Sequence, residues 1–418
     1  MPTPIRFPRR FLWGASLSAH QAEGGLSNQW TAWELENAKS LAAQSPYQYG
    51  DLPSWPEVSK QAKRAENYLS GQASDHWNRW RDDIELVEKL GLNTLRFSIE
   101  WSRIEPTEGG WNIEAMEHYK QYLAELKRRD ITPIVTLFHF TLPEWFAQKG
   151  GFTKRSTLVY FQQFVTKITQ ELGGQLGYVI TINEPTVYAW QSYGTGAWPP
   201  NVTSRWQSWR VMRNLLRAHH QAAKILHDRN RRIKVSMAHN ISYVYAGDDA
   251  KLSVWSAHMI DWVTNRYLLK RSLKSSDFIG VNFYFSNRVY GYRIHNPEER
   301  VSDLGWNMEP GHLQYVLEDL HERYKMPLIV TENGLADASD SQRGWWLTET
   351  IQALWQARQS GADVRGYVHW SLLDNFEWDK GKWPRFGLVA VDYDSQKRTL
   401  RPSARALARL IPTLKGDK

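Results

Sequence analysis

Two glutamates stand directly after short apolar runs, in positions where carboxylates could do chemistry. Glu184 follows the run 178–183, and Glu332 follows the run 328–331. Either glutamate alone could be a loop residue that pairs with a neighbouring cation. Facing each other across one pocket, however, they would supply a protonated acid and an ionised carboxylate, the two groups that glycoside cleavage requires. Their positions therefore indicate glycosidic chemistry, provided that the fold brings them together.

Other polar residues stand at or just after the ends of further apolar runs. They are Gln21, Glu23, Arg96, Glu100, His139, Asn183, Asn282, Tyr284, Asn333, Trp370, Glu377 and Trp378. Isolated cases would be helix caps or satisfied core groups, but a full ring is difficult to attribute to stability alone. Arg96 lies within an apolar run and needs a carboxylate partner, either in a structural ion pair or at Glu332. A nearby cation and the Tyr284 hydroxyl would favour the charged form of Glu332, which leaves Glu184 as the protonated carboxyl.

The elements that must position these residues are short β-branched runs that alternate with longer amphipathic stretches. Strands are expected at 11–16, 94–99, 131–138, 178–182, 234–238, 278–283, 328–331 and 366–370. Helices are expected at 75–90, 111–129, 157–172, 204–228, 251–270, 311–324, 341–360 and 402–410. The polar, proline-containing segment 42–59 is expected to be a long loop.

Eight strands in alternation with eight helices predict the α/β class and one closed (β/α)₈ barrel over residues 1–418. An open doubly wound sheet is the alternative, but it would favour a glycine-rich phosphate turn after an early strand, and no such turn is present. In a barrel the active site lies at the carboxyl ends of the strands. The fourth and seventh strands stand nearly opposite each other, so Glu184 and Glu332 are expected to face one pocket.

The composition excludes several classes of protein. There is no Cys, which excludes disulfides, thiolate metal sites and a Cys nucleophile. The 13 His form no ligand motif, and phosphate-binding loops and nucleophile elbows are absent, so no metal and no organic cofactor are expected. No run of 18 apolar residues occurs and the first residues lack the apolar core of a signal peptide, so we expect a cytoplasmic protein that does not bind membranes.

Charge and aromatic content bear on the partner. The formal net charge is +8, but the densest basic stretch, 229–234, lies where a helix is expected to end. Scattered charge does not favour a nucleic-acid partner. The 22 Trp are an unusual number for this length. Indole faces suit the C–H face of a sugar ring, although a Trp-rich core is the alternative explanation.

The sequence resembles glycoside hydrolase family 1, the β-glucosidase and β-galactosidase family, over essentially its whole length. The matching segments are FLWGASLSAHQAEGG (11–25), LRFSIEWSRIEP (95–106), TINEP (181–185), VNFY (281–284), DLGW (303–306), VTENG (330–334), HWSLLDNFEW (369–378), RFGLVAVDY (385–393) and RPSA (401–404). Segments 181–185 and 330–334 together are highly specific, and the sequence after Glu332 is most similar to the archaeal-type branch. The resemblance implies a barrel enzyme that hydrolyses non-reducing terminal β-D-glucosides, and also fucosides and galactosides, with retention.

The resemblance also implies a role for each site residue. Glu184 matches the acid/base and Glu332 the nucleophile, with Arg96 and Tyr284 as the partners that hold the nucleophile. Asn183 matches the residue that binds the sugar 2-hydroxyl. The expected substrate-binding residues are Gln21, His139, Asn183, Asn282, Trp306, Trp370, Glu377 and Trp378, with Trp370 as the platform under the sugar and Trp306 on the aglycone side.

Two departures from the family pattern bear on specificity. Phe140 stands where the family usually has Trp, so an indole donor to the sugar 3-hydroxyl is missing. The chain is also short for the family, which predicts trimmed loops and a more open aglycone side. Two alternatives stay open: a 6-phospho-β-glycosidase, suggested by Lys380 and Lys382 but opposed by Glu377, and a non-catalytic barrel that binds sugars or other small molecules.

Overall fold

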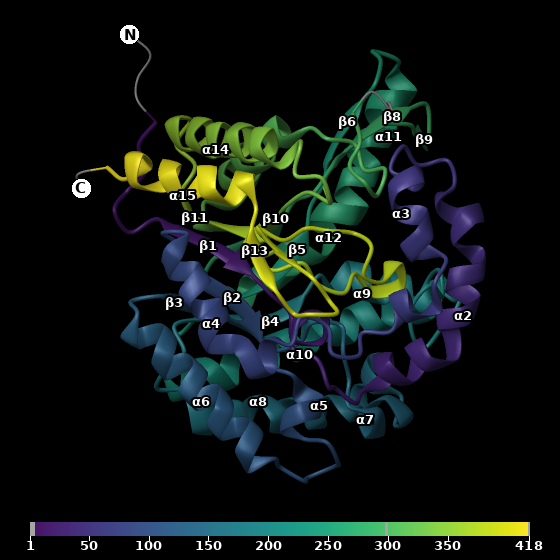
Figure 1. The fold of residues 1–418 in the computed structure, drawn as a ribbon. Coiled ribbons are helices and arrows are strands. Elements are labelled where there is room, and N and C mark those ends of the chain that lie inside the picture. Colours follow the sequence, from purple (N-terminus) through teal and green to yellow (C-terminus); the bar gives the residue numbers. More distant parts are fainter. Residues whose placement is uncertain (1–4, 297–299, 417–418) are drawn as a thin grey trace.

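Eight parallel strands close into a barrel in the computed structural model, which describes residues 5–296 and 300–416. Around the barrel the strands follow chain order (Figure 1). Their bounds are β1 Leu12–Ser16, β2 Thr94–Ser98, β3 Thr132–Thr136, β4 Tyr178–Asn183, β5 Lys234–Asn240, β7 Ile279–Asn282, β10 Leu328–Asn333 and β11 Val364–Trp370. The predicted α/β class and closed (β/α)₈ barrel are therefore confirmed.

Helices pack around the outside of this barrel (Figure 1). The helices of the expected alternation are α4 His76–Lys89, α6 Ile113–Arg128, α8 Leu158–Leu172, α10 Arg205–Arg229, α11 Lys251–Asp261, α12 Tyr267–Ser272, α13 Leu313–Tyr324, α14 Arg343–Gln359 and α15 Pro402–Leu414. The expected helix 251–270 is interrupted by a π-helical turn over Trp262–Arg266. Shorter or additional helices are α1 Ala19–Ala22, α2 Gln29–Tyr49, α3 Trp55–Ala62, α5 Trp101–Ile104, α7 Glu144–Gln148 and α9 Pro185–Tyr193.

The expectation of a long loop at 42–59 is wrong. The segment belongs to the end of α2 and to most of α3. Pro46 lies inside α2 and has no N–H for the Ala42 carbonyl, but the Ser45 hydroxyl donates to that carbonyl at 2.8 Å. A side-chain donor thus compensates for the group that proline lacks, which composition alone does not reveal.

Two small sheets lie outside the barrel. Strands β6 Tyr243–Ala246, β8 Ser286–Tyr290 and β9 Arg293–Ile294 form a three-stranded sheet that packs against α11. Figure 1 shows this sheet and α11 projecting from the rest of the molecule. Strands β12 Val389–Val391 and β13 Arg398–Leu400 form a hairpin. None of the described helices is both long enough and apolar enough to span a membrane.

Apolar side chains from the strands fill the barrel below the site. One buried cluster contains Leu12, Ile134, Ile180, Ala238, Phe278, Ile329 and Val368. Leu12, Ile180 and Ile329 come from the first half of their strands and Phe278 precedes β7, so the cluster fills the barrel from its amino-terminal end, as in other packed barrels of this kind. The open space is consequently at the carboxyl ends of the strands.

The two strands that carry the glutamates are irregular at their ends. The β4–β5 register shifts between Ile180 and Asn183, and the β10–β7 register shifts between Val330 and Glu332. Such irregularities redirect a side chain relative to a regular strand. After β10, a Cβ on Gly334 would lie 1.8 Å from the Trp370 carbonyl oxygen. The glycine is therefore required by the close approach of β11.

Candidate active site

A cavity of about 340 Å³ opens at the carboxyl ends of the barrel strands. It is lined by ten of the predicted site residues, namely Gln21, His139, Asn183, Glu184, Tyr284, Trp306, Glu332, Trp370, Glu377 and Trp378. Segments from almost the whole chain therefore converge on one pocket. A volume of this size accommodates a small sugar and part of its aglycone.

The carboxylate of Glu332 is bound on both oxygens. Arg96 on β2 approaches Oε1 with Nη1 at 2.5 Å, and the Tyr284 hydroxyl donates to Oε2 at 2.8 Å. Arg96 is 1% exposed and is itself fixed by three further acceptors, on Thr136, Thr331 and Asn183. The buried cation and the hydroxyl stabilise the negative charge of Glu332 and fix its orientation.

Glu184 has a different environment. Its Oε1 accepts a hydrogen bond from Asn282 Nδ2 at 2.8 Å and a longer one from Asn240 Nδ2 at 3.4 Å. No cation is paired with it among the described residues. Burial, and secondarily the negative charge of Glu332, raise the pKa of Glu184 to about 8. At neutral pH this carboxyl is mostly protonated.

Three cavity residues have left-handed backbone conformations that L side chains adopt rarely. Glu184 has φ 38°, Phe140 has φ 72° and Trp378 has φ 51°. Glu184 also precedes Pro185, the first residue of α9, and its N–H donates to the Ala238 carbonyl at 2.8 Å. Strained residues of this kind are characteristic of functional sites, where the surrounding structure holds them in place.

Polar and aromatic side chains form the other walls. Gln21 Nε2 donates to Glu377 Oε2 at 3.3 Å and to the Phe376 carbonyl at 2.8 Å. Burial is the main cause that raises the pKa of Glu377 to about 8. His139 stacks against Trp370, with ring centroids 5.9 Å apart, and its Nε2 accepts a hydrogen bond from Asn183 Nδ2 at 3.3 Å. Burial holds the pKa of His139 well below its usual range, so its ring is neutral.

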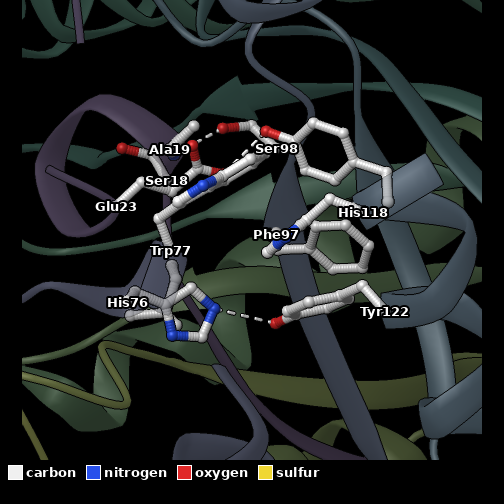
Figure 2. Close-up of a pocket in the computed structure, with 11 residues that line it drawn as sticks. Ser18, Ala19, Glu23, His76, Trp77, Phe97, Ser98, His118 and Tyr122 are labelled. Carbon is white, nitrogen blue, oxygen red and sulfur yellow. Dashed lines mark hydrogen bonds between the residues drawn. The ribbon is translucent and has the colours of Figure 1, made fainter. Parts of the chain in front are cut away.

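Some residues of the predicted ring lie elsewhere. Asn282 does not line the cavity; it is fully buried behind Glu184 and holds that carboxyl. Glu100 accepts hydrogen bonds from Ser102 and Thr141 outside the cavity. Glu23 and its neighbours line a separate pocket of about 10 Å³, room for about one water molecule (Figure 2). Glu23 is bonded there to Arg103 and Tyr119.

The structure adds residues that sequence reasoning did not single out. Asn240, the last residue of β5, reaches Glu184. Asn240 could have been predicted, because it is a polar residue at the end of a strand. It was missed because the strand was expected to end at Ala238. Trp198 lines the cavity and donates its indole N–H to Asp379 at 2.9 Å. No local pattern predicts that contact, which joins residues far apart in the sequence.

Phe140, which replaces the Trp usual in the family, lines the cavity. Its ring is 3% exposed and packs against Trp198 and Trp378, with centroids 5.1 and 5.3 Å away. Lys380, which lines the cavity, is paired with Asp379 at 2.5 Å. Lys382 does not line the cavity. Within residues 5–296 and 300–416, no group of three or more His, Asp or Glu could hold a metal ion.

Comparisons with known proteins agree with this geometry. The model of glycosyl hydrolase family 1 matches residues 3–278 and 257–415. The chain belongs to glycosyl hydrolase family 1. A 1,4-beta-D-glucan glucohydrolase of Thermotoga neapolitana is 29% identical, covering 97% of this chain and 98% of that protein. A bifunctional beta-D-glucosidase/beta-D-fucosidase of Bifidobacterium breve is 28% identical, covering 97% and 98%.

A solved structure gives the same result for the fold. The beta-glycosidase from Pyrococcus horikoshii superimposes with a TM-score of 0.86 at 33% identity, covering 100% of this chain and 97% of that one. Membership of glycosyl hydrolase family 1 makes this protein a β-glycosidase that cleaves with retention, by double displacement. The predicted family, enzyme class and mechanism are thus confirmed, and the non-catalytic barrel is excluded.

Proposed function

We propose that the enzyme hydrolyses non-reducing terminal β-D-glucosides, with β-D-fucosides and β-D-galactosides as further substrates, and that residues 1–418 act as one catalytic domain. The observation that carries this proposal is the contrast between two carboxyls in one cavity. Glu332 is bound by Arg96 and Tyr284, whereas Glu184 is buried with a raised pKa. Relatives named for glucosidase and fucosidase activity support the sugar preference.

In the first step the Glu332 carboxylate attacks the anomeric carbon. The bond to the aglycone oxygen breaks, and Glu184 gives its proton to that oxygen, so the leaving group departs as a neutral alcohol. The products of this step are a glycosyl ester of Glu332 and an ionised Glu184. The negative charge of Glu332 is lost when the ester forms, which weakens its ion pair with Arg96. Arg96 stays in place because its other acceptors hold it, so it can stabilise the carboxylate again when the ester is cleaved.

In the second step Glu184 acts in the opposite direction. Its carboxylate takes a proton from water while the water oxygen attacks the anomeric carbon, and the bond to Glu332 breaks. Two inversions at one carbon give net retention. Glu184 regains its proton and Glu332 its charge, so the enzyme returns to its starting state.

The remaining cavity residues are assigned to binding. We propose that Asn183 binds the 2-hydroxyl, that Gln21, His139, Glu377 and Trp378 bind the other hydroxyls, and that Trp370 lies beneath the sugar. Asn282 is a positioning residue, because it acts through Glu184. Trp306 packs against Tyr284 at the edge of the cavity and suits an aglycone contact.

A 6-phosphorylated substrate is not favoured. The carboxyl of Glu377 is retained, Lys380 is neutralised by Asp379, and Lys382 lies outside the cavity. A panel of 4-nitrophenyl glycosides tests the proposal directly. We expect the highest kcat/KM with the β-glucoside, measurable turnover of the β-fucoside and β-galactoside, and none of the 6-phospho-β-glucoside. Preferred turnover of the phosphorylated sugar would overturn it.

A further inference from the structure

Helices α10 and α11 carry exposed Trp side chains, beside Arg on α10 and beside aliphatic residues on α11, on surface that no described element covers. On α10, the stripe is Arg205, Trp206, Trp209, Arg210 and Arg213. On α11 and the π-helical turn after it, the stripe is Leu252, Trp255, Met259, Trp262 and Val263. Trp206 and Trp255 are 62% and 61% exposed. We call these two stripes together the α10–α11 face.

The spacing in each stripe is that of one helix face. Residues 209 and 210 lie three and four positions after 206 and four and three positions before 213, and residues 252, 255, 259 and 262 follow one another at intervals of three or four. An apolar face of this kind in a globular helix is normally buried. Here the opposite sides of the helices pack against the protein, with Val211, Leu215 and Ala218 of α10 buried. The fold therefore already has a buried apolar face on α10, and the exposed stripes are not needed to pack the helices against the protein.

The stripe on α10 is strongly basic. Between residues 185 and 227 the sequence contains five Lys and Arg and no Asp or Glu. The Arg210 guanidinium lies 5.2 Å from the ring centroid of Trp206, and that of Arg213 lies 4.4 Å from that of Trp209. Stacking on the indoles holds these cations at the surface. The stripe thus presents positive charge and indole rings together.

Helix α12, which continues the chain from α11 after the π-helical turn, contacts α10 where His219 Nε2 lies 3.1 Å from the Ser272 carbonyl oxygen. The helices that follow the paired strands β4 and β5 are thus joined through α12. Helix α9 packs against α10 and supplies Val187 and Gln191 to the cavity wall. The sheet of β6, β8 and β9 that α11 covers projects beyond the barrel (Figure 1).

Contrary to the expectation from the sequence that the protein does not bind membranes, we propose that the α10–α11 face binds the surface of an anionic lipid bilayer. Trp residues favour the interface between headgroups and acyl chains, and clusters of Lys and Arg attract anionic headgroups. Helices with Trp and Leu beside basic residues lie in the plane of such an interface. The substrate class that follows is β-glycosides whose aglycone is a lipid held in that surface, presented beside the cavity. This substrate class rests on the proposed function.

Two other occupants fit less well. A symmetric dimer would bring the same patch of each copy together, so the Arg side chains of both α10 stripes would gather in one interface, and residues 185–227 supply no Asp or Glu to pair with them. A nucleic acid would match the cations and could stack on indoles. It would leave the aliphatic part of the α11 stripe, Leu252, Met259 and Val263, without a partner.

The test is flotation of the full-length enzyme with vesicles of phosphatidylcholine alone or with 30% phosphatidylglycerol. We expect binding only to the anionic vesicles, weakened by salt. Arg210→Gln/Arg213→Gln should lower the partition coefficient about 30-fold, since each cation near the surface contributes about fivefold. The control Lys89→Gln/Lys127→Gln has the same net charge but removes cations from the opposite end of the barrel, and it should bind like the wild type.

Apolar contact is tested separately. Trp206→Ser/Trp209→Ser and Trp255→Ser/Trp262→Ser should each lower binding by on the order of tenfold, whereas Ile113→Ser, at a position that is 80% exposed on α6, should not. The same Trp variants should lose turnover of a dialkylglycerol β-glucoside carried in anionic vesicles, and keep turnover of soluble 4-nitrophenyl β-glucoside.

Each other outcome has a distinct meaning. Absence of flotation with active soluble turnover would overturn the bilayer proposal and leave the proposed function intact. Dimers in sedimentation that the Trp variants dissociate, or retention of single-stranded DNA in place of vesicles, would assign the face to those partners and also overturn it. Flotation without turnover of any soluble glycoside would support the lipid surface and contradict the proposed function.

Discussion

Replacement of Glu184 by Gln separates proton donation from every other contribution to catalysis. The side chain keeps its size and can still contact Asn282, but it has no proton to transfer. Positioned acids contribute roughly 10²- to 10⁴-fold to a rate. A substrate with a poor leaving group, such as an alkyl β-glucoside, should lose that much in kcat/KM. A 2,4-dinitrophenyl β-glucoside needs little protonation and should form the glycosyl-enzyme at nearly the original rate.

The raised pKa of Glu184 gives this prediction a pH signature. The acid must be protonated in the first step, so activity is present below its pKa and is lost above it. With a pKa of about 8, about nine in ten molecules carry the proton at pH 7, and kcat/KM for the alkyl glucoside should fall about tenfold per pH unit above pH 8. Glu184→Gln should abolish this decline.

Glu377 provides the necessary control, because its pKa is also raised to about 8. Profiles of kcat/KM from pH 5 to 10 are to be measured for wild type, Glu184→Gln and Glu377→Gln with both leaving groups. A decline that disappears in Glu377→Gln and persists in Glu184→Gln would assign the titration to Glu377. Equal losses for both leaving groups in Glu184→Gln would refute the reasoning that this carboxyl is the acid.

Further variants test the sugar end of the cavity and its stability. Phe140→Trp alone should not raise kcat/KM for glucosides: a hydrogen bond contributes about 0.5–1.5 kcal/mol, and overpacking against Trp198 costs about 1–3 kcal/mol. Phe140→Trp/Trp198→Phe should give a several-fold gain, and no gain would show that the missing donor is neutral. Because Glu377 holds its proton more tightly when folded than when unfolded, the stability it contributes below pH 4.5 is lost as the pH rises to about 8. Glu377→Gln should therefore raise the free energy of unfolding by about 3 kcal/mol at pH 7 and much less at pH 4.5; an equal change at both pH values in urea titrations would contradict this.

The sequence was sufficient for the barrel because most strands are short β-branched runs and most covering helices have an apolar face, although β1 (LWGAS) has no β-branched residue and a π-helical turn interrupts the expected helix 251–270. It was not sufficient for segment 42–59, where the hydroxyl of Ser45 takes over the acceptor that Pro46 leaves free. Proline content indicates a loop unless a side-chain donor is known to be in place, and that is a property of the folded structure.

The site shows the same limit. The rule that polar residues follow the strands correctly placed Gln21, His139 and Glu377 in the cavity. It does not show whether a given side chain points into the cavity or away from it. Glu23 follows the same strand as Gln21, yet it is bonded to Arg103 and Tyr119 away from the cavity. Asn282 was expected to touch substrate, and it lies behind Glu184. Direction depends on packing with distant segments, which one sequence does not specify.

The central claim is that Glu332 forms a covalent bond to the sugar. A 2-deoxy-2-fluoro-β-glucosyl fluoride slows the second step more than the first, so the glycosyl-enzyme accumulates and can be digested and sequenced by mass spectrometry. The account predicts one added fluoroglucosyl group per chain, on the peptide that contains Glu332, and no labelling of Glu332→Gln. Labelling on Glu184, or full turnover by Glu332→Gln without an added nucleophile, would contradict it.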